Sequence, residues 1–143
     1  MVVAIVAVIL FGLVLAVVVA IARDHGPTPG DVAVAYELAW DRLDFDVLYT
    51  LSAGELRDGR DRPEFVDSKR AAYENQPTLR DLVATVAIDQ TIVAGNAASV
   101  ATRVALRDGS TVRNRIDLAR RNARWQIVAY QLTPGDNESP AVP

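Results

Sequence analysis

The chain has 143 residues, a formal net charge of −3 at pH 7, one histidine and no cysteine. The lack of cysteine excludes a disulfide framework and thiolate chemistry. No basic run is long enough to indicate a nucleic-acid partner.

The N-terminal 22 residues carry no charged side chain; the first charges are Arg23 and Asp24. A helix of this length spans about 33 Å, enough to cross a hydrocarbon core of about 30 Å. A cleaved signal peptide is the alternative, because Ala20-Ile21-Ala22 resembles a cleavage site. The basic n-region is missing, however, and the apolar core exceeds the usual length of about 7–15 residues. We therefore predict a retained transmembrane helix at residues 1–22 and a linker at residues 23–30.

The orientation of a membrane span follows the Lys and Arg residues near its ends. None precedes residues 1–22, whereas Arg23 follows them at once. This asymmetry favours a single-pass protein of the plasma membrane, with its N-terminus outside and its domain in the cytoplasm.

Residues 31–132 have the length of one domain, and its first predicted helix covers residues 29–49. Thr28 is a candidate N-cap, Pro29 suits the first helical position, and Asp31 lies three residues after the cap. The helical spacing places four side chains toward the core: Tyr36, Trp40, Leu43 and Val47.

A second helix is predicted over residues 62–76, with Pro63 near its start and Pro77 just beyond its end. The last segment, residues 133–143, contains three prolines and two acids without apolar periodicity. This composition indicates a disordered tail.

From Leu79 onward the apolar period changes to two, which predicts a four-stranded antiparallel meander packed against helices on one face. The middle two strands place these residues inward: Val100, Thr102, Val104 and Leu106, then Val112, Asn114, Ile116 and Leu118. In the first strand, the inner face is predicted to hold Leu82, Ala84, Val86, Ile88, Gln90 and Ile92. In the last strand, Trp125, Ile127 and Ala129 are predicted inside, and Val128, Tyr130 and Leu132 outside.

The loops between strands follow from these faces, since a slip by one residue would turn every apolar side chain outward. Consistent faces require three-residue loops at residues 94–96 and 108–110, with Leu106 opposite Val112. They also require a two-residue loop at Asn122-Ala123.

The segments WDRLDFDVLYTLS and GNAASVATRVALRDGSTVRNRIDLARRNARWQIVAYQL resemble the NTF2-like (SnoaL-like, cystatin-like) proteins. The resemblance covers residues 31–132 and implies an α+β fold of two to three helices on a curved four-stranded sheet. It says little about function, since the fold hosts isomerases, cyclases, dehydratases, transport factors and non-catalytic partner domains.

Catalytic members of this fold line a pocket between helices and sheet with His, Asp or Tyr. The only histidine here, His25, lies in the predicted linker, and strands two to four carry no inward carboxylate. A Tyr–carboxylate pair could come only from Tyr49, Tyr73 or Tyr130 with a helix acid. No zinc spacing, phosphate loop or nucleophile elbow is present, so we expect no catalytic residue, metal or cofactor. The candidate pocket residues are Thr102, Asn114, Tyr49 and Tyr73.

A partner surface is predicted on the outer sheet face, because the last strand is apolar on both sides and such strands are usually covered on both sides. The candidate contact residues are Arg103, Arg113, Arg115, Val128, Tyr130 and Leu132. The arginines would suit an acidic partner or anionic headgroups.

These features lead to two hypotheses. The first is a non-catalytic, membrane-anchored accessory subunit of a larger bacterial membrane complex. Lys69 is the only lysine, a bias typical of GC-rich bacteria, and small actinobacterial proteins of this build occur as accessory subunits of respiratory oxidase complexes. The alternative is a membrane-tethered small-molecule binder or SnoaL-like isomerase or cyclase. A filled core around Thr102 and Asn114 would favour the first, and an open cavity with a Tyr–carboxylate pair the second.

Overall fold

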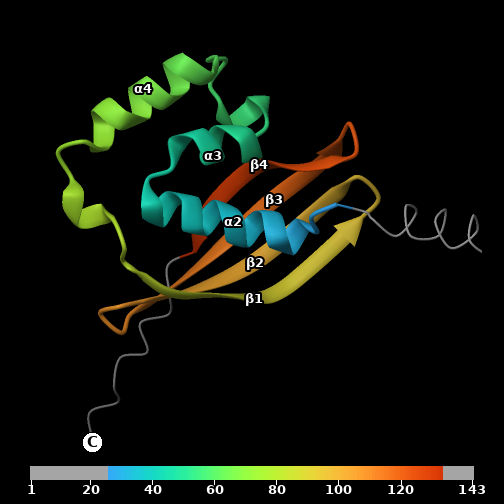
Figure 1. The fold of residues 1–143 in the computed structure, drawn as a ribbon. Coiled ribbons are helices and arrows are strands. Elements are labelled where there is room, and N and C mark those ends of the chain that lie inside the picture. Colours follow the sequence, from blue (N-terminus) through green and yellow to red (C-terminus); the bar gives the residue numbers. More distant parts are fainter. Residues whose placement is uncertain (1–25, 134–143) are drawn as a thin grey trace, which may run out of the picture.

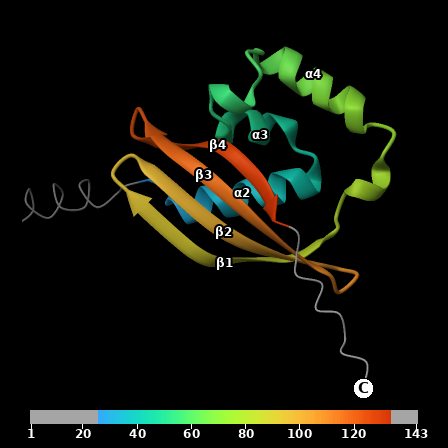
Figure 2. The same cartoon turned by 180° about the vertical axis from the view of Figure 1, so that it is seen from behind.

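A computed structural model describes residues 26–133 as three α-helices and one antiparallel sheet. The helical part comprises α2 (Pro29–Arg42), α3 (Phe45–Leu51), the short 3-10 helix η1 (Gly54–Leu56), α4 (Arg62–Tyr73) and η2 (Pro77–Leu79). The strands are β1 (Val83–Ala94), β2 (Ala97–Leu106), β3 (Thr111–Arg121) and β4 (Arg124–Thr133), in the order β1-β2-β3-β4. The helices lie on one face of the sheet (Figure 1). From behind, none of them covers the other face (Figure 2).

The described residues contain no helix long and apolar enough to cross a membrane. The predicted anchor at residues 1–22 and His25 lie outside the described residues. So does the predicted tail apart from Thr133, which ends β4.

The start of α2 confirms the predicted capping pattern. The Thr28 hydroxyl accepts the Asp31 N–H at 3.2 Å, and the Asp31 carboxylate accepts the Thr28 N–H at 2.9 Å. These two bonds satisfy backbone donors that a helix start would otherwise leave unpaired.

The single helix predicted over residues 29–49 is in fact two helices. Leu43 adopts a left-handed conformation with φ of 53°, and Asp44 then caps α3 by accepting the Val47 N–H at 3.1 Å. Because the chain turns here, Leu43 and Leu48 are buried, whereas Val47 is 37% exposed. The prediction that Val47 faces the core is therefore wrong. The Asp44 cap starts a new helix here, so the helical spacing of residues 36–47 does not continue along one helix.

The β2–β3 pair has the predicted faces but a different register. Thr102 lies opposite Asn114 and Val104 opposite Val112, so the predicted pairing of Leu106 with Val112 is off by two residues. The Leu106 N–H donates to the Ser110 carbonyl at 2.9 Å. The loop is therefore Arg107-Asp108-Gly109, and Gly109 takes the positive φ of 88° that such loops favour.

The outer two strands contain irregularities that change their faces. In β1, the register shifts between Ile88 and Gln90, so Ile88 lies opposite the inward Thr102 but Ile92 lies opposite the outward Ser99. Gln90 and Ile92 are consequently outside, contrary to the prediction, and the first turn is the two-residue loop Gly95-Asn96. The predicted two-residue loop at Asn122-Ala123 is confirmed.

A further irregularity lies in β4, between the pairs Leu118–Ile127 and Asp117–Ala129. Val128 is the additional residue of this β-bulge, and the side chains after it change sides relative to strict alternation. Tyr130 therefore lies opposite the buried Ile116, on the inner face. Leu132 follows on the same face, opposite Asn114, and Ala129 points outward. The predicted outer placement of Tyr130 and Leu132 and the inner placement of Ala129 are wrong.

Candidate functional site

A buried carboxylate lies between α2 and the sheet. Glu37, in the middle of α2, is only 5% exposed. Its Oε1 accepts the Thr102 hydroxyl at 2.7 Å and the Asn114 Nδ2–H at 2.8 Å, and its Oε2 accepts the Tyr130 hydroxyl at 3.2 Å. Burial of a carboxylate is costly unless donors replace water, and here three side chains from three strands do so.

The sheet positions these donors. Thr102 in β2 and Asn114 in β3 are direct cross-strand partners, so both side chains meet α2 at the same level. The bulge at Val128 brings the Tyr130 hydroxyl in β4 to the other oxygen of the carboxylate. Burial and the nearby charge of Glu37 raise the pKa of Tyr130 well above its usual range, so the phenol stays protonated and donates.

A cavity of about 340 Å³ opens beside this carboxylate. Its wall includes Glu37, Asn114 and Tyr130, together with Trp40 and Tyr73 from the helices. The rest of the lining is mostly apolar: Asp41, Leu43, Leu79, Leu82, Val83, Val104, Leu106, Val112 and Leu132. An apolar cavity with a few convergent polar groups is typical of a small-molecule site.

Two buried polar atoms of the cavity-lining residues have no hydrogen-bond partner within residues 26–133: Trp40 Nε1 and Asn114 Oδ1. The orientation of the Asn114 amide is set by Glu37, because a carboxylate accepts only and must face the Nδ2 donor. Asn114 Oδ1 therefore remains an acceptor in need of a donor. Buried polar atoms are nearly always paired. The Tyr36 side chain lies beside Trp40, so of these two atoms Asn114 Oδ1 marks the place for a bound molecule or water.

Two of the four predicted pocket residues, Asn114 and Tyr73, line the cavity, and Thr102 belongs to the buried Glu37 cluster without being part of the wall. Thr102 and Asn114 both contact Glu37. Tyr49 belongs to neither the cavity nor the cluster: it lies on α3 and packs on Phe65 with ring centroids 5.5 Å apart.

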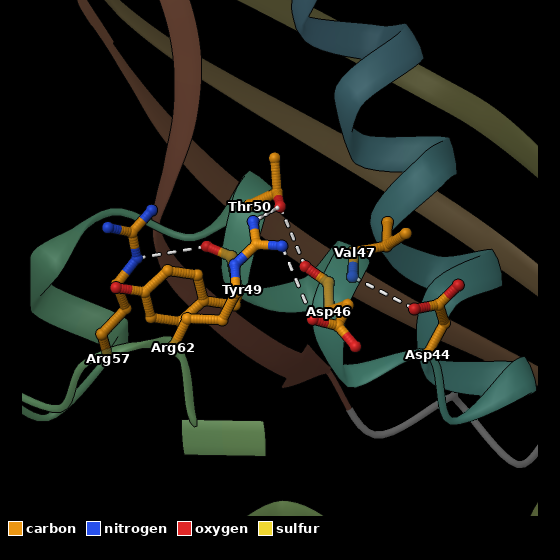
Figure 3. A network of polar contacts seen from close by, with 7 residues as sticks. All are labelled: Asp44, Asp46, Val47, Tyr49, Thr50, Arg57 and Arg62. Atoms are coloured by element: carbon orange, nitrogen blue, oxygen red, sulfur yellow. Dashed lines mark hydrogen bonds and ion pairs between the residues drawn. The ribbon is translucent and has the colours of Figure 1, made fainter. Parts of the chain in front are cut away.

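The surroundings of Tyr49 are a surface network (Figure 3). The Arg57 guanidinium lies 4.1 Å from the Tyr49 ring centroid, and Arg57 Nε–H donates to the Tyr49 carbonyl. Arg62 donates to the Thr50 hydroxyl at 2.7 Å and pairs with Asp46. These contacts tie the loop before α4 to α3, which gives Tyr49 a structural role.

Glu37 was missed by sequence reasoning, although a helix acid paired with Tyr130 was one of the options left open. The available signal was the inward pair Thr102 and Asn114. Two buried polar side chains at one level of a sheet need a polar partner on the helix that covers them. Glu37 lies four residues after the buried Ala33, on the face that meets the sheet.

The arginines of the outer sheet face lie where the alternation predicts. Two of them are in ion pairs, Arg103 with Asp89 and Arg115 with Asp117, and Arg113 is the cross-strand partner of Arg103. These ion pairs weaken the attraction of the outer face for an acidic partner. At the far end of the sheet, hydrogen bonds from Arg121 lower the pKa of the Glu55 carboxyl to about 2.

No group of three or more His, Cys, Asp or Glu side chains within residues 26–133 is placed to hold a metal ion. Two carboxylates line the cavity, Glu37 and Asp41, and both already accept hydrogen bonds from the protein. These oxygens are too few to form the coordination shell of a metal ion, so the cavity suits an organic molecule better.

Comparisons with known proteins give the fold. No protein-family model matches the chain, and no curated protein sequence matches it. A SEC-C motif containing protein from Rhodopseudomonas palustris superposes with a TM-score of 0.54 at 18% identity, over 74% of this chain and 79% of that one. A protein described as an NTF2-like transpeptidase from Campylobacter jejuni superposes with a TM-score of 0.51 at 12% identity, over 71% and 97%. At such identities the likeness shows the fold alone, and residues 26–133 have an α+β, NTF2-like fold.

Proposed function

We propose that the domain binds a small, largely apolar molecule in the cavity beside Glu37. One observation carries this proposal: the Tyr130–Glu37 pair forms part of the wall of an open cavity. Of the two hypotheses drawn from the sequence, this geometry favours the small-molecule binder, because a non-catalytic partner domain needs neither an open cavity nor a buried carboxylate.

The cavity has an apolar outer part and a polar inner end, an arrangement common in small-molecule sites. Its outer part is lined by leucines, of which Leu82 is 41% and Leu132 is 68% exposed. Its inner end carries Glu37, Asn114 and Tyr130. Apolar walls supply affinity, and a few buried polar groups fix orientation.

The same site has the groups needed to transfer a proton to or from a bound molecule. Glu37 Oε2 accepts only the Tyr130 hydroxyl among the described residues and retains acceptor capacity. A bound molecule with an acidic C–H or N–H at this oxygen would meet a general base with a phenol beside it. This pairing is what the SnoaL-like alternative requires.

The binding proposal is tested with the neutral fluorescent probe N-phenyl-1-naphthylamine and the full-length chain in lipid nanodiscs. We expect saturable fluorescence enhancement beyond that of empty nanodiscs. Leu106→Trp, which fills the cavity, should abolish it. The matched control Ile92→Trp places the same ring on the outer sheet face and should leave it unchanged. Absence of saturable binding, or equal binding by Leu106→Trp, would refute the proposal.

A second candidate function, the membrane-anchored accessory subunit, is favoured by a different feature. A groove of about 400 Å³, as open to solvent as the cavity beside Glu37, lies near the hairpin end of the sheet and includes Ile92, Ala97 and Val128. Ile92 is 54% exposed, and no described helix covers this face (Figure 2). An exposed apolar groove of this kind is a common site of contact with another protein.

Val128→Glu tests this second function. The substitution should leave the domain folded but reduce recovery of partner subunits from detergent-solubilised native membranes, because the new carboxylate would be buried unpaired in the contact. Ala72→Glu, on the exposed side of α4, is the matched control and should not reduce recovery. Equal recovery with both variants would remove the outer face from consideration.

A further inference from the structure

The cavity beside Glu37 is acidic. Two carboxylates line it, Glu37 and Asp41, one helical turn apart on α2. Its lining contains no Arg, Lys or His. The Lys69 ammonium lies 5.8 Å from the ring centroid of Trp40, a lining residue, and 5.6 Å from that of Phe65. Lys69 belongs to α4 and is not part of the wall.

Neither carboxylate has an ion-pair partner within residues 26–133. Glu37 is held by three neutral donors. Asp41 accepts the N–H groups of Leu82 and Val83 at 2.7 and 3.0 Å, which fixes it where β1 begins, toward the mouth. Hydrogen bonds from neutral donors hold these charges in place but leave them uncompensated, so the cavity attracts positive charge.

The unpaired polar atom at the inner end also requires a donor. Asn114 is 4% exposed, and its Oδ1 has no partner while its Nδ2 is bound to Glu37. Glu37 and Asn114 Oδ1 are thus two adjacent acceptors. A ligand that satisfies both must bring N–H or O–H groups, and a charged N–H donor would form the stronger bonds.

The aromatic residues of the wall fit the same ligand. Trp40, Tyr73 and Tyr130 line the cavity, and the Trp40 and Tyr73 rings are 5.9 Å apart. Aromatic faces attract organic cations, especially where water is displaced. An anionic ligand would meet two carboxylates and find no basic residue in the wall.

We infer that the cavity selects an organic ammonium ion with at least one N–H and an apolar body. The ammonium group lies against Glu37 and Asn114 Oδ1, flanked by aromatic rings, and the apolar body extends along the leucines of the mouth. This inference rests on the proposed function and adds the chemical class of the ligand.

The test compares three probes of the same shape and different charge: 2-phenylethylammonium, neutral 2-phenylethanol and anionic 3-phenylpropionate. Binding to the full-length chain in nanodiscs of zwitterionic lipid is measured by calorimetry, with empty nanodiscs subtracted. We expect the ammonium ion to bind at least about tenfold tighter than the alcohol, and the carboxylate to bind more weakly than either.

Glu37→Gln keeps the shape of the side chain and an acceptor for Thr102 and Asn114. It should bring the ratio of the affinities for the ammonium ion and the alcohol close to one. Glu64→Gln removes an exposed carboxylate of α4 outside the cavity and should change neither affinity. The N-trimethylated ammonium probe, which lacks N–H, should bind more weakly than its parent.

Several results would overturn the inference: equal affinity for ammonium and alcohol, tighter binding of the carboxylate, no binding of the ammonium ion, or a preference that survives Glu37→Gln. The naphthylamine probe separates the two proposals. If that neutral probe still binds in the cavity and the charge preference is absent, only the ligand class is wrong. If no probe binds, the binding function itself fails.

Discussion

Replacing Glu37 by alanine is expected to lower the free energy of unfolding by about 3 kcal/mol. The substitution leaves the Thr102 hydroxyl, the Asn114 Nδ2–H and the Tyr130 hydroxyl without their acceptor. A buried donor left unpaired costs about 1–3 kcal/mol, and partial re-pairing among the three donors limits the sum. Urea unfolding of the full-length chain, followed by the fluorescence of Trp40 and Trp125, measures the change.

Two variants separate this effect from general sensitivity of the helices. Glu37→Gln retains an acceptor and should cost about 1 kcal/mol, whereas the exposed Glu64→Ala should stay within about 0.5 kcal/mol. A loss below about 1 kcal/mol for Glu37→Ala would mean that the carboxylate is solvated and the three hydrogen bonds contribute little.

The middle of the sheet was predictable from the sequence because it is regular. β2 and β3 pair without a bulge, so strict alternation places Thr102 and Asn114 on the inner face. The two-residue loop at Asn122-Ala123 follows from the same parity, and both of its residues have positive φ. The β2–β3 register escaped prediction because a shift of two residues keeps every face unchanged.

The edges of the sheet were less predictable because each contains a bulge. In β4, apolar residues on both sides suggested a strand covered on both faces, whereas the extra residue Val128 turns Tyr130 and Leu132 inward. Whether a bulge forms depends on the tertiary contacts that the side chains after it make, and these contacts are not visible in the local sequence. Here Tyr130 reaches Glu37, a residue 93 positions away in the sequence.

Prediction of the candidate site from the sequence was limited in the same way, because part of it depends on long-range contacts. The two strand residues of the Glu37 cluster are visible in the alternation, but the acid that joins them lies 65 and 77 positions earlier on a helix. A single glutamate among alanines and aromatic residues resembles a solvated position, and its burial becomes apparent only when the sheet supplies donors. Local patterns therefore predicted half of this cluster, and tertiary contacts determine the rest.

Ile127→Ala is expected to destabilise the domain by about 3 kcal/mol, because deletion of a fully buried isoleucine removes apolar contacts and leaves a cavity. Ile127 has no exposed surface, and its carbonyl accepts the Ala53 N–H at 2.8 Å, which joins the segment after α3 to β4. The neighbouring Val128→Ala is the matched control. Val128 is only half-buried and is the extra residue of the bulge, so its truncation should cost less than about 1 kcal/mol. Both values come from urea unfolding. Equal losses at the two positions, or a larger loss at Val128, would contradict the placement of Ile127 on the inner face of the sheet and of Val128 outside it.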